Sequence, residues 1–252
     1  MAKKTKAETV EGARREITRE LFGDPGNREH LHGYLVVAAP ILAELADLGY
    51  DLDSLDDLRH QGKPWKTALP VLLRWLPKID DLSLKESVVR CLSVPWVGNA
   101  ATAELIEEFK RYAPVLQRYS NLWVGKHLTE PTEQEKKLFP AFSLAWTIGN
   151  ALSIVDVRGF ERQVIELCTN PRYGDARQMA VLGLGRLRNP EAEEAAVELL
   201  HHDGVQLHAI MALGKMKSKR ALFELEKLLT DKRAAIRKEA RRTITKITRE
   251  HK

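Results

Sequence analysis

Apolar side chains recur at helical spacing along most of the chain, and one stretch of this pattern is repeated. Its first copy, Asp175 to Leu187, places small and aliphatic residues at i, i+3, i+4 and i+7, the spacing that gives a helix one buried stripe. The pattern returns from Gly204 to Met216 and from Asp231 to Ile247, with spacings of 29 and 31 residues between copies. A fixed period of this length predicts stacked units of two helices.

Small residues fill the aligned positions of the copies. The pairs Leu184-Gly185, Leu213-Gly214 and Ile244-Thr245 occupy one such place. Because glycine lowers intrinsic helicity by about 1 kcal/mol, its use here predicts close approach of neighbouring helices. Asp175 and Asp231 stand where they would cap the second helix of each unit.

Weaker copies precede these three. Ile148-Gly149 lies 36 residues before Leu184-Gly185 and matches it. Lys66 to Val97 is interpreted as a divergent early repeat. Within it, Ser83 to Glu86 forms a capping-box pattern that predicts a helix over Leu84 to Val94. Thr132 to Glu135 is a second such pattern, so part of the irregular stretch between Ala113 and Pro140 is expected to be helical.

The N-terminal part differs in composition. Residues 1–30 are polar and charged, and we expect a partly disordered segment with an amphipathic helix over Glu8 to Leu21 and a break at 23–27. Leu31 to Leu48 predicts an apolar helix, kinked or divided at Pro40 and ended by Gly49. Residues 31–252 are predicted to form one repeat domain, irregular over 31–156 and regular over 157–252.

The repeat resembles the HEAT family, particularly its short, phycobilisome-lyase-type branch, over roughly Val157 to Ile247. The resemblance implies an all-α, right-handed α-solenoid of about five or six helix pairs. The resemblance predicts the fold and not the function, because function varies widely within the family.

Aromatic and basic residues gather where the repeat spacing is lost. Insertions in repeat proteins fall on one face, often the binding face. We therefore predict that this insertion binds a partner through Arg118, Tyr119, Trp123, Lys126 and His127.

Positive charge is concentrated at the C-terminus. The chain carries a net charge of +5, but residues 215–252 carry +9 and the remainder −4. A helix over Ala234 to Arg249 should bury Ile236, Ala240, Thr243, Ile244 and Ile247. Its other faces form either a solubilising cap or a polyanion-binding surface, made of Arg233, Arg237, Lys238, Arg241, Arg242 and Lys246.

The sequence contains no motif that predicts catalysis or a cofactor. Walker, dinucleotide-binding, HExxH and GxSxG patterns are absent. His201, His202, Asp203 and His208 are interpreted as an inter-helix turn and not as a metal site. Cys91 and Cys168 are expected to be buried, reduced thiols.

Five tryptophans lie in the middle third, at positions 65, 75, 96, 123 and 146. Core packing between irregular repeats is the first interpretation. The second is an aromatic concave surface such as that of the HEAT-like alkylpurine DNA glycosylases, for which Trp123, Trp146 and Asp156 are the nearest counterparts here.

These patterns favour a non-enzymatic cytoplasmic scaffold that binds a protein partner through its concave surface. The alternative is a nucleic-acid-binding protein, including DNA repair, that uses the basic C-terminal repeat. A lyase acting on a bound chromophore is third and rests on fold analogy. Neither a secretory signal nor a membrane-spanning run is predicted.

Overall fold

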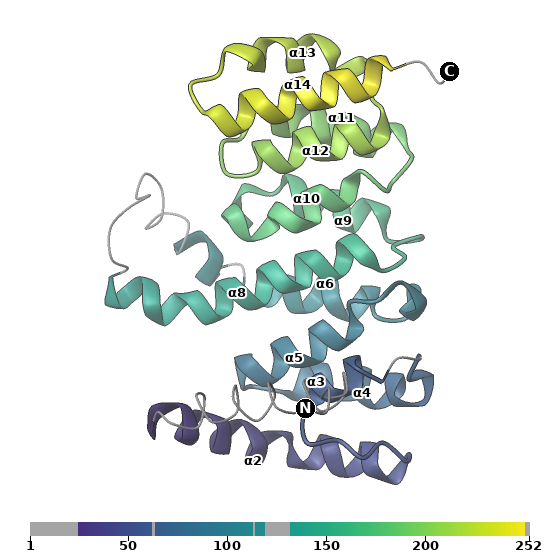
Figure 1. The fold of residues 1–252 in the computed structure, drawn as a ribbon, viewed down its shortest axis with the longest axis vertical. Helices are drawn as coiled ribbons and strands as arrows, with labels where there is room; N and C mark the ends of the chain where they lie inside the picture. Colours follow the sequence, from purple (N-terminus) through teal and green to yellow (C-terminus); the bar gives the residue numbers. More distant parts are fainter. Residues whose placement is uncertain (1–24, 62–63, 113, 119–131, 250–252) are drawn as a thin grey trace, which may run out of the picture.

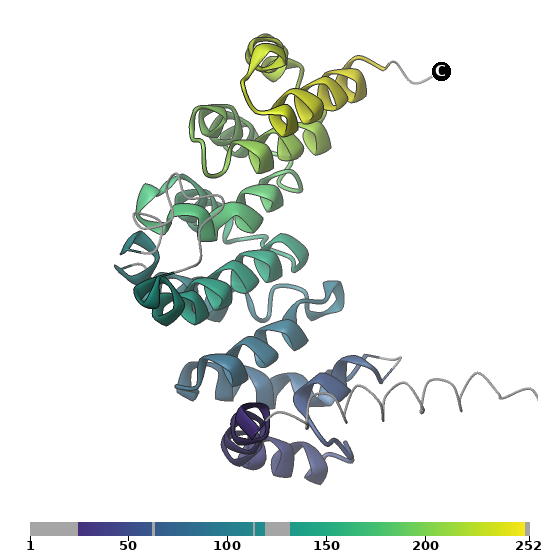
Figure 2. The ribbon, with the colours of Figure 1, turned by 60° about the vertical axis from the view of Figure 1, so that its left-hand side comes forward.

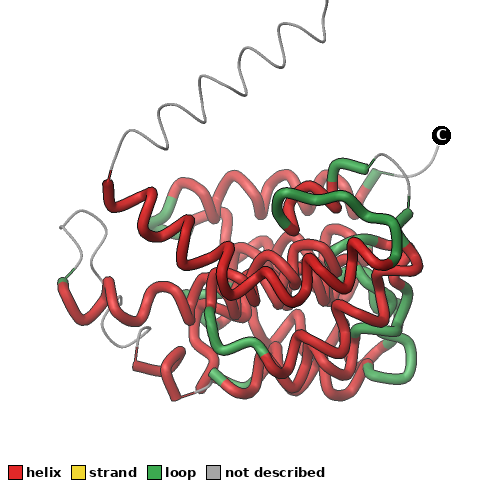
Figure 3. Tube along the Cα trace, turned by 90° about the horizontal axis from the view of Figure 1, so that it is seen from below, coloured by secondary structure: helices red, strands yellow, loops and turns green. Residues whose placement is uncertain are grey.

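The computed structural model describes residues 25–61, 64–112, 114–118 and 132–249. Within these ranges the chain forms helices and connecting turns, without a strand (Figure 3). The helices stack into a column with two layers (Figure 1), and the column curves along its length (Figure 2). The predicted all-α solenoid is confirmed.

Two N-terminal helices, α2 (Pro25–Asp47) and α3 (Leu55–Arg59), precede the repeating pairs. Among the described residues the pairs number five, in agreement with the predicted five or six. They are α4 (Leu69–Trp75) with α5 (Leu82–Leu92), α6 (Thr102–Arg111) with α8 (Glu133–Ile154), α9 (Glu161–Thr169) with α10 (Gln178–Leu184), α11 (Pro190–Glu198) with α12 (Gln206–Met216), and α13 (Leu222–Lys227) with α14 (Ala234–Thr248).

The second helices of the pairs form one continuous layer. α5 packs on α8, α8 on α10, α10 on α12 and α12 on α14. The first helices form the other layer, in which α6 contacts α9 and α9 contacts α11. In Figure 2 the layer of second helices lies on the inner side of the curve. This layer therefore provides the inner surface of the solenoid.

Glycines set the distance between the second helices. A Cβ atom on Gly183 would lie 2.9 Å from Ser153 Cα, and one on Gly185 would lie 2.9 Å from the Ala212 carbonyl oxygen. Side-chain atoms essentially never approach so closely. The predicted close approach of neighbouring repeats is thus confirmed at α8–α10 and α10–α12.

Two predictions about helix starts are wrong. Ser83 does not cap α5, because the helix begins at Leu82 and the Asp81 carboxylate accepts a hydrogen bond of 2.7 Å from the Leu84 N–H. Asp175 and Asp231 do not occupy N-cap positions either. Each lies two residues before the actual N-cap, where Asp231 accepts a bond of 2.8 Å from the Arg233 N–H. This is the local turn that aspartate favours before a helix.

The capping box at the start of α8 is confirmed. The Thr132 N–H donates to Glu135 Oε2 at 2.6 Å, and the Glu135 N–H donates to Thr132 Oγ1 at 3.3 Å. From there α8 runs through Pro140 to Ile154 as one helix. The insertion therefore contributes the first turns of a long inner helix.

At the N-terminal end, α2 begins at Pro25, inside the predicted break. Proline is tolerated in a first helical turn, because its missing N–H would have no partner there. The helix continues through Pro40 and is not divided into two. Gly49, with φ of +85°, follows the end of the helix as predicted. The expected helix over Glu8 to Leu21 lies outside the described residues.

One continuous apolar core runs through the column. Cys91 and Cys168 are part of it as free thiols, which confirms that both are buried. The Cys91 thiol donates to the Leu55 carbonyl oxygen at 3.3 Å. In the described part of the chain, no helix is both long enough and apolar enough to cross a membrane.

The C-terminal helix α14 closes the column as the sequence predicts. Its buried side chains are Ile236, Ala240, Thr243 and Ile247, and Ile244 is half-buried. Thr243 lies against the preceding repeat, where a Cβ atom on Gly214 would come within 3.0 Å of its hydroxyl.

Candidate functional site on the inner surface

The second helices present one stripe of side chains each to the inner side of the curve. In α12 the stripe is His208, Met211 and Lys215, at i, i+3 and i+7, and these side chains lie between buried positions of the same helix. The repeat alignment gives the equivalent positions in the neighbouring second helices. The stripes are Ser143, Trp146 and Asn150 in α8, Met179 and Leu182 in α10 with Arg186 in the turn that follows it, and Glu239, Arg242 and Lys246 in α14; none of these residues is buried.

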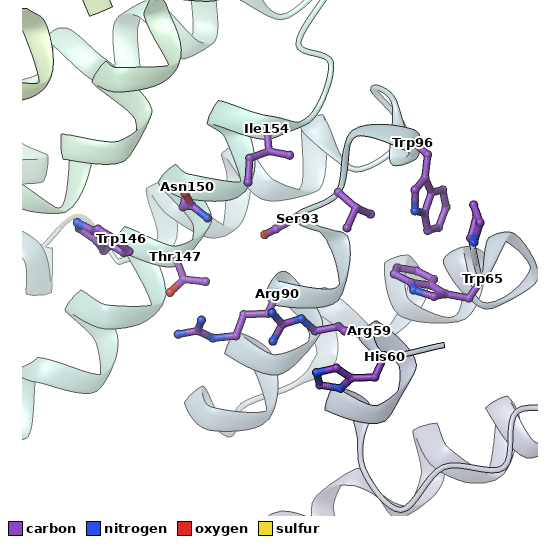
Figure 4. A pocket seen from close by; sticks show the side chains of 12 residues that line it. Arg59, His60, Trp65, Arg90, Ser93, Trp96, Trp146, Thr147, Asn150 and Ile154 are labelled. Atoms are coloured by element: carbon purple, nitrogen blue, oxygen red, sulfur yellow. The ribbon is translucent and has the colours of Figure 1, made fainter. Parts of the chain in front are cut away.

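A cavity of about 590 Å³ opens at the N-terminal half of this surface, between the end of α3, the end of α5 and α8. We call it the inner groove. Figure 4 shows the guanidinium groups of Arg59 and Arg90 at its centre, with Trp146 on one side and Trp65 and Trp96 on the other. Further lining residues are His60, Pro64, Ser93, Val94, Thr147, Asn150 and Ile154.

The aromatic walls of the groove are fixed in different ways. Trp65 is buried and meets Trp96 edge to face, with 4.6 Å between ring centroids and an angle of 78°. Trp146 is half-buried, and its Nε1–H donates to Gln178 Oε1 at 3.4 Å. Each aromatic ring is therefore held in place before a ligand arrives.

The two arginines keep part of their surface open to solvent. Arg90 Nε donates to Glu86 Oε1 at 3.0 Å, and Arg59 Nη1 donates to Asp56 Oδ1 at 3.2 Å. Their side chains remain 47% and 41% exposed, so each guanidinium can still receive a further partner. The Thr147 hydroxyl also donates to Glu86, at 3.3 Å, and thereby joins α5 to α8.

This arrangement offers several kinds of binding contact. Aromatic faces and guanidinium groups supply apolar contact, stacking and hydrogen-bond donors, which are features of interface hot spots. Asp156, the aspartate singled out from the sequence, does not line the groove. Arg158 Nε donates to Asp156 at 2.7 Å, and this hydrogen bond lowers the pKa of that carboxyl.

Both interpretations of the tryptophans apply, to different residues. Trp65 belongs to the core, whereas Trp96 and Trp146 are half-buried and line the inner groove. Trp75 is half-buried elsewhere, where its Nε1–H donates to Glu44 at 3.1 Å. Trp123 lies outside the described residues.

Most of the predicted partner-binding insertion also lies outside the described residues. This applies to Tyr119, Trp123, Lys126 and His127. Arg118 is described: it is exposed, and its Nε donates to the Pro114 carbonyl oxygen at 3.3 Å.

The six basic residues at the C-terminus do not form one open surface. Arg233 donates to Asp203 at 3.0 Å and to Asp231, and this bonding lowers the Asp231 pKa to about 2. Arg237 Nη1 donates to the carbonyl oxygens of Asp231 and Lys232 at 2.7 and 2.9 Å. The remaining four, Lys238, Arg241, Arg242 and Lys246, are exposed.

The side chains of the histidine-rich turn have separate surroundings. Across the described ranges no group of three or more His, Cys, Asp or Glu side chains is placed to hold one. His201 lies 3.8 Å from Glu224, and Asp203 pairs with Arg233. His208 Nδ1 is buried without a hydrogen-bond partner, and burial lowers the His208 pKa.

Sequence reasoning missed the charged and polar members of the inner surface. Arg59 comes from α3, before the repeating pairs, and Arg90 from α5 in the first pair, so they meet only in the fold. Arg186 and Lys215 had an available signal, since each directly follows an aligned glycine.

Comparison with known proteins identifies the repeat. Residues 162–245 match the family described as HEAT repeats. No curated protein matches the chain. Among solved structures, one engineered protein is 20% identical, with 91% of this chain and 96% of that chain covered and a TM-score of 0.40. Another is 21% identical, with coverages of 72% and 79% and a TM-score of 0.36. Such TM-scores carry no argument.

Proposed function

Because residues 162–245 are HEAT repeats, we propose that the protein is a non-enzymatic scaffold that binds a protein partner through the inner surface of the solenoid. The observation that carries this proposal is the inner groove. It combines three tryptophans and two partly exposed arginines in a cavity of about 590 Å³ on the inner layer. Tryptophan and arginine are the residues most enriched at binding hot spots.

The surface around the groove supports an extended interface. The stripes of α8, α10 and α12 continue from it along the column, with Trp146, Leu182 and Met211 as half-buried apolar side chains. Methionine adapts its shape to different partners. A partner anchored in the groove would therefore find further apolar contacts along the next repeats.

The insertion remains a second predicted contact. Aromatic and basic residues from Arg118 to His127 precede α8 in the chain, and α8 contributes Trp146 and Asn150 to the groove. Trp123→Ala is expected to weaken partner binding and to leave the melting temperature nearly unchanged. A large loss of stability would assign Trp123 to the core instead.

The test is affinity capture from native lysate of the source organism, with and without nuclease. We expect captured protein to be lost when Trp146→Ala is combined with Arg90→Ala and to survive nuclease treatment. Phe223→Ala is the matched control, because Phe223 is 67% exposed on α13, in the layer of first helices. Equal capture by the groove variant and the control would overturn the proposal. Loss of capture on nuclease treatment would favour the nucleic-acid alternative.

A further inference from the structure

The stripes of three consecutive inner helices end in a cation. Lys215 ends the stripe of α12 and Lys246 that of α14, and Arg186 holds the equivalent position in the turn directly after α10; all three side chains are exposed. We call this set the cation row. The repeat alignment places its members at equivalent positions, and Asn150 holds the same position in α8.

Contacts in the fold support this alignment. The Cβ atom of Lys215 lies 2.9 Å from where a Cβ atom on Gly185 would be, so Lys215 packs beside the residue that precedes Arg186. Partial burial lowers the pKa of Lys215, and the nearby charges of Arg186 and Lys246 lower it further. The three cations therefore follow one another along a single edge of the inner surface.

Acidic neighbours do not neutralise this row. Among the described residues, Arg186, Lys215 and Lys246 form no ion pair with a carboxylate, whereas Arg220 and Lys227 in the outer layer pair with Glu194 and Glu224. Arg186 Nη1 instead donates to the Ser153 carbonyl oxygen at 2.7 Å. Three like charges at one edge that are not held in ion pairs make a surface that attracts anions.

An apolar row runs beside the cation row. Trp146, Leu182 and Met211 each lie four residues before the last position of their stripe, one helical turn away, and are half-buried. A cavity of about 560 Å³ is lined by Lys215 together with two further cations, Arg188 and Lys217, and one carboxylate, Glu193. A ligand lying here would meet apolar side chains along one flank and positive charge along the other.

The distance between successive cations along the column favours one type of ligand. Packed helices lie about 8–10 Å apart, so the cations recur at about that interval along the column. A polyproline II segment rises about 3.1 Å per residue with three residues per turn, and every third side chain recurs after about 9 Å on the same side. The distance between every third side chain of such a segment thus matches the distance between successive cations along the column.

We propose that the cation row and the apolar row bind an acidic peptide segment in polyproline II conformation, with a carboxylate at every third residue. The carboxylates meet Arg186, Lys215 and Lys246, and apolar side chains of the same segment meet Trp146, Leu182 and Met211. This names the partner chemistry of the inner surface and rests on the proposed function.

The probe is a fluorescently labelled peptide of four Pro-Leu-Glu triplets, compared with a peptide of the same composition whose glutamates are clustered at one end. Anisotropy is measured on the full chain. We expect the triplet peptide to bind at least about fivefold more tightly than the clustered one, since well-placed ion pairs contribute up to about a factor of five each. Equal binding of the two peptides would overturn the proposal.

Charge reversal locates the contact. Arg186→Glu and Lys215→Glu should each weaken triplet binding about tenfold, because attraction is replaced by repulsion. The matched controls Arg162→Glu and Lys219→Glu reverse exposed cations outside the inner surface and should change binding less than about twofold. Equal effects in both pairs would refute the assignment, as would tighter binding of a 12-nucleotide oligo-dT than of the triplet peptide.

The two proposals fail in different ways. If capture of a partner is lost in the Trp146 variant but unchanged in Lys215→Glu, the scaffold function is supported and the acidic-segment proposal is refuted. If the triplet peptide binds in a Lys215-dependent way but no partner is captured through the groove, the role of the cation row is supported and the scaffold function is refuted.

Discussion

Lys85 Nζ donates to Glu108 Oε2 at 2.6 Å, and the side chains of both residues are 1–2% exposed. The pair joins α5 to α6, which belong to consecutive repeats. Arg111 Nη2 also lies 3.1 Å from the second Glu108 oxygen. A buried pair of this kind is costly to break, because the remaining charge is left without a partner in the core.

Glu108→Ala is therefore expected to lower the free energy of unfolding by about 3–5 kcal/mol. The double change Lys85→Met with Glu108→Leu should restore most of this loss, since apolar residues of similar size often replace a buried pair without penalty. Denaturant unfolding of the full chain measures both. Glu107→Ala is the control, because Glu107 is 71% exposed and pairs only with Lys110 at 3.1 Å. Equal losses of unfolding free energy in Glu107→Ala and Glu108→Ala would contradict a special cost of breaking the buried pair.

Gly185→Ala tests the close approach of α10 and α12. Alanine is the better helix former by about 1 kcal/mol, yet its Cβ atom would press on the Ala212 carbonyl oxygen at 2.9 Å. We expect a net loss of about 1–3 kcal/mol in unfolding free energy, as for other overpacked sites.

The matched control is Thr245→Ala. Thr245 holds the equivalent position in α14 and is exposed. This change should stay within about 0.5 kcal/mol. A stabilising Gly185→Ala, measured by thermal or denaturant unfolding, would show that the helices can move apart at little cost.

The two thiols should be inert while the protein is folded. Burial, together with the nearby Asp56 carboxylate, raises the pKa of Cys91 to about 12, and burial also raises that of Cys168. Since the thiolate is the reactive form, we expect both cysteines to react with an aromatic disulfide reagent only after unfolding. Fast labelling of the native protein, or a disulfide between the two, would contradict this expectation.

The same shifts predict a pH dependence. A folded-state pKa above the ordinary value of about 9 stabilises the protein fully below pH 9, and the contribution is lost as pH rises toward the folded value. Unfolding free energy should therefore fall above pH 9. Cys91→Ala should make this fall shallower, which denaturant titrations between pH 7 and 11 would show.

The repeating half of the fold was predictable from the sequence because its determinants are local. Gly185 and Gly214 occupy the same place in consecutive copies, and the same residue type serves the same close contact. The buried stripe of α14 follows directly from helical spacing. Exact helix starts were less predictable, since Asp81 and Ser83 both offer a capping side chain and only the packed chain selects one.

The inner groove could not be predicted in the same way. Arg59 is the last residue of a five-residue helix and Trp96 lies in a 3-10 turn, so neither belongs to the repeat pattern. Their meeting with Trp146 depends on how irregular segments pack across two repeats. The Lys85–Glu108 pair likewise joins positions that no periodicity relates. Non-local contacts of this type require the fold.

The basic surface of α14 gives a last prediction, which separates the scaffold from the nucleic-acid alternative. Arg233 and Arg237 are engaged by neighbouring oxygens, so only Lys238, Arg241, Arg242 and Lys246 remain exposed. Each phosphate contact contributes about −0.9 to the slope of log K against log salt. Duplex DNA should therefore bind only at low salt, with a slope no steeper than about −3.6.

Fluorescence anisotropy with labelled duplex DNA and RNA at several salt concentrations measures this slope. Lys238→Glu with Arg241→Glu should remove the residual binding without unfolding the protein, because both side chains are exposed. Arg237→Glu should also lower stability, since its hydrogen bonds to the Asp231 and Lys232 carbonyl oxygens are lost. Tight binding at physiological salt, with a slope steeper than about −5, would require all six cations to reach phosphates. It would favour the nucleic-acid alternative over a solubilising cap, because a cap requires only a polar outer face and no bound polyanion.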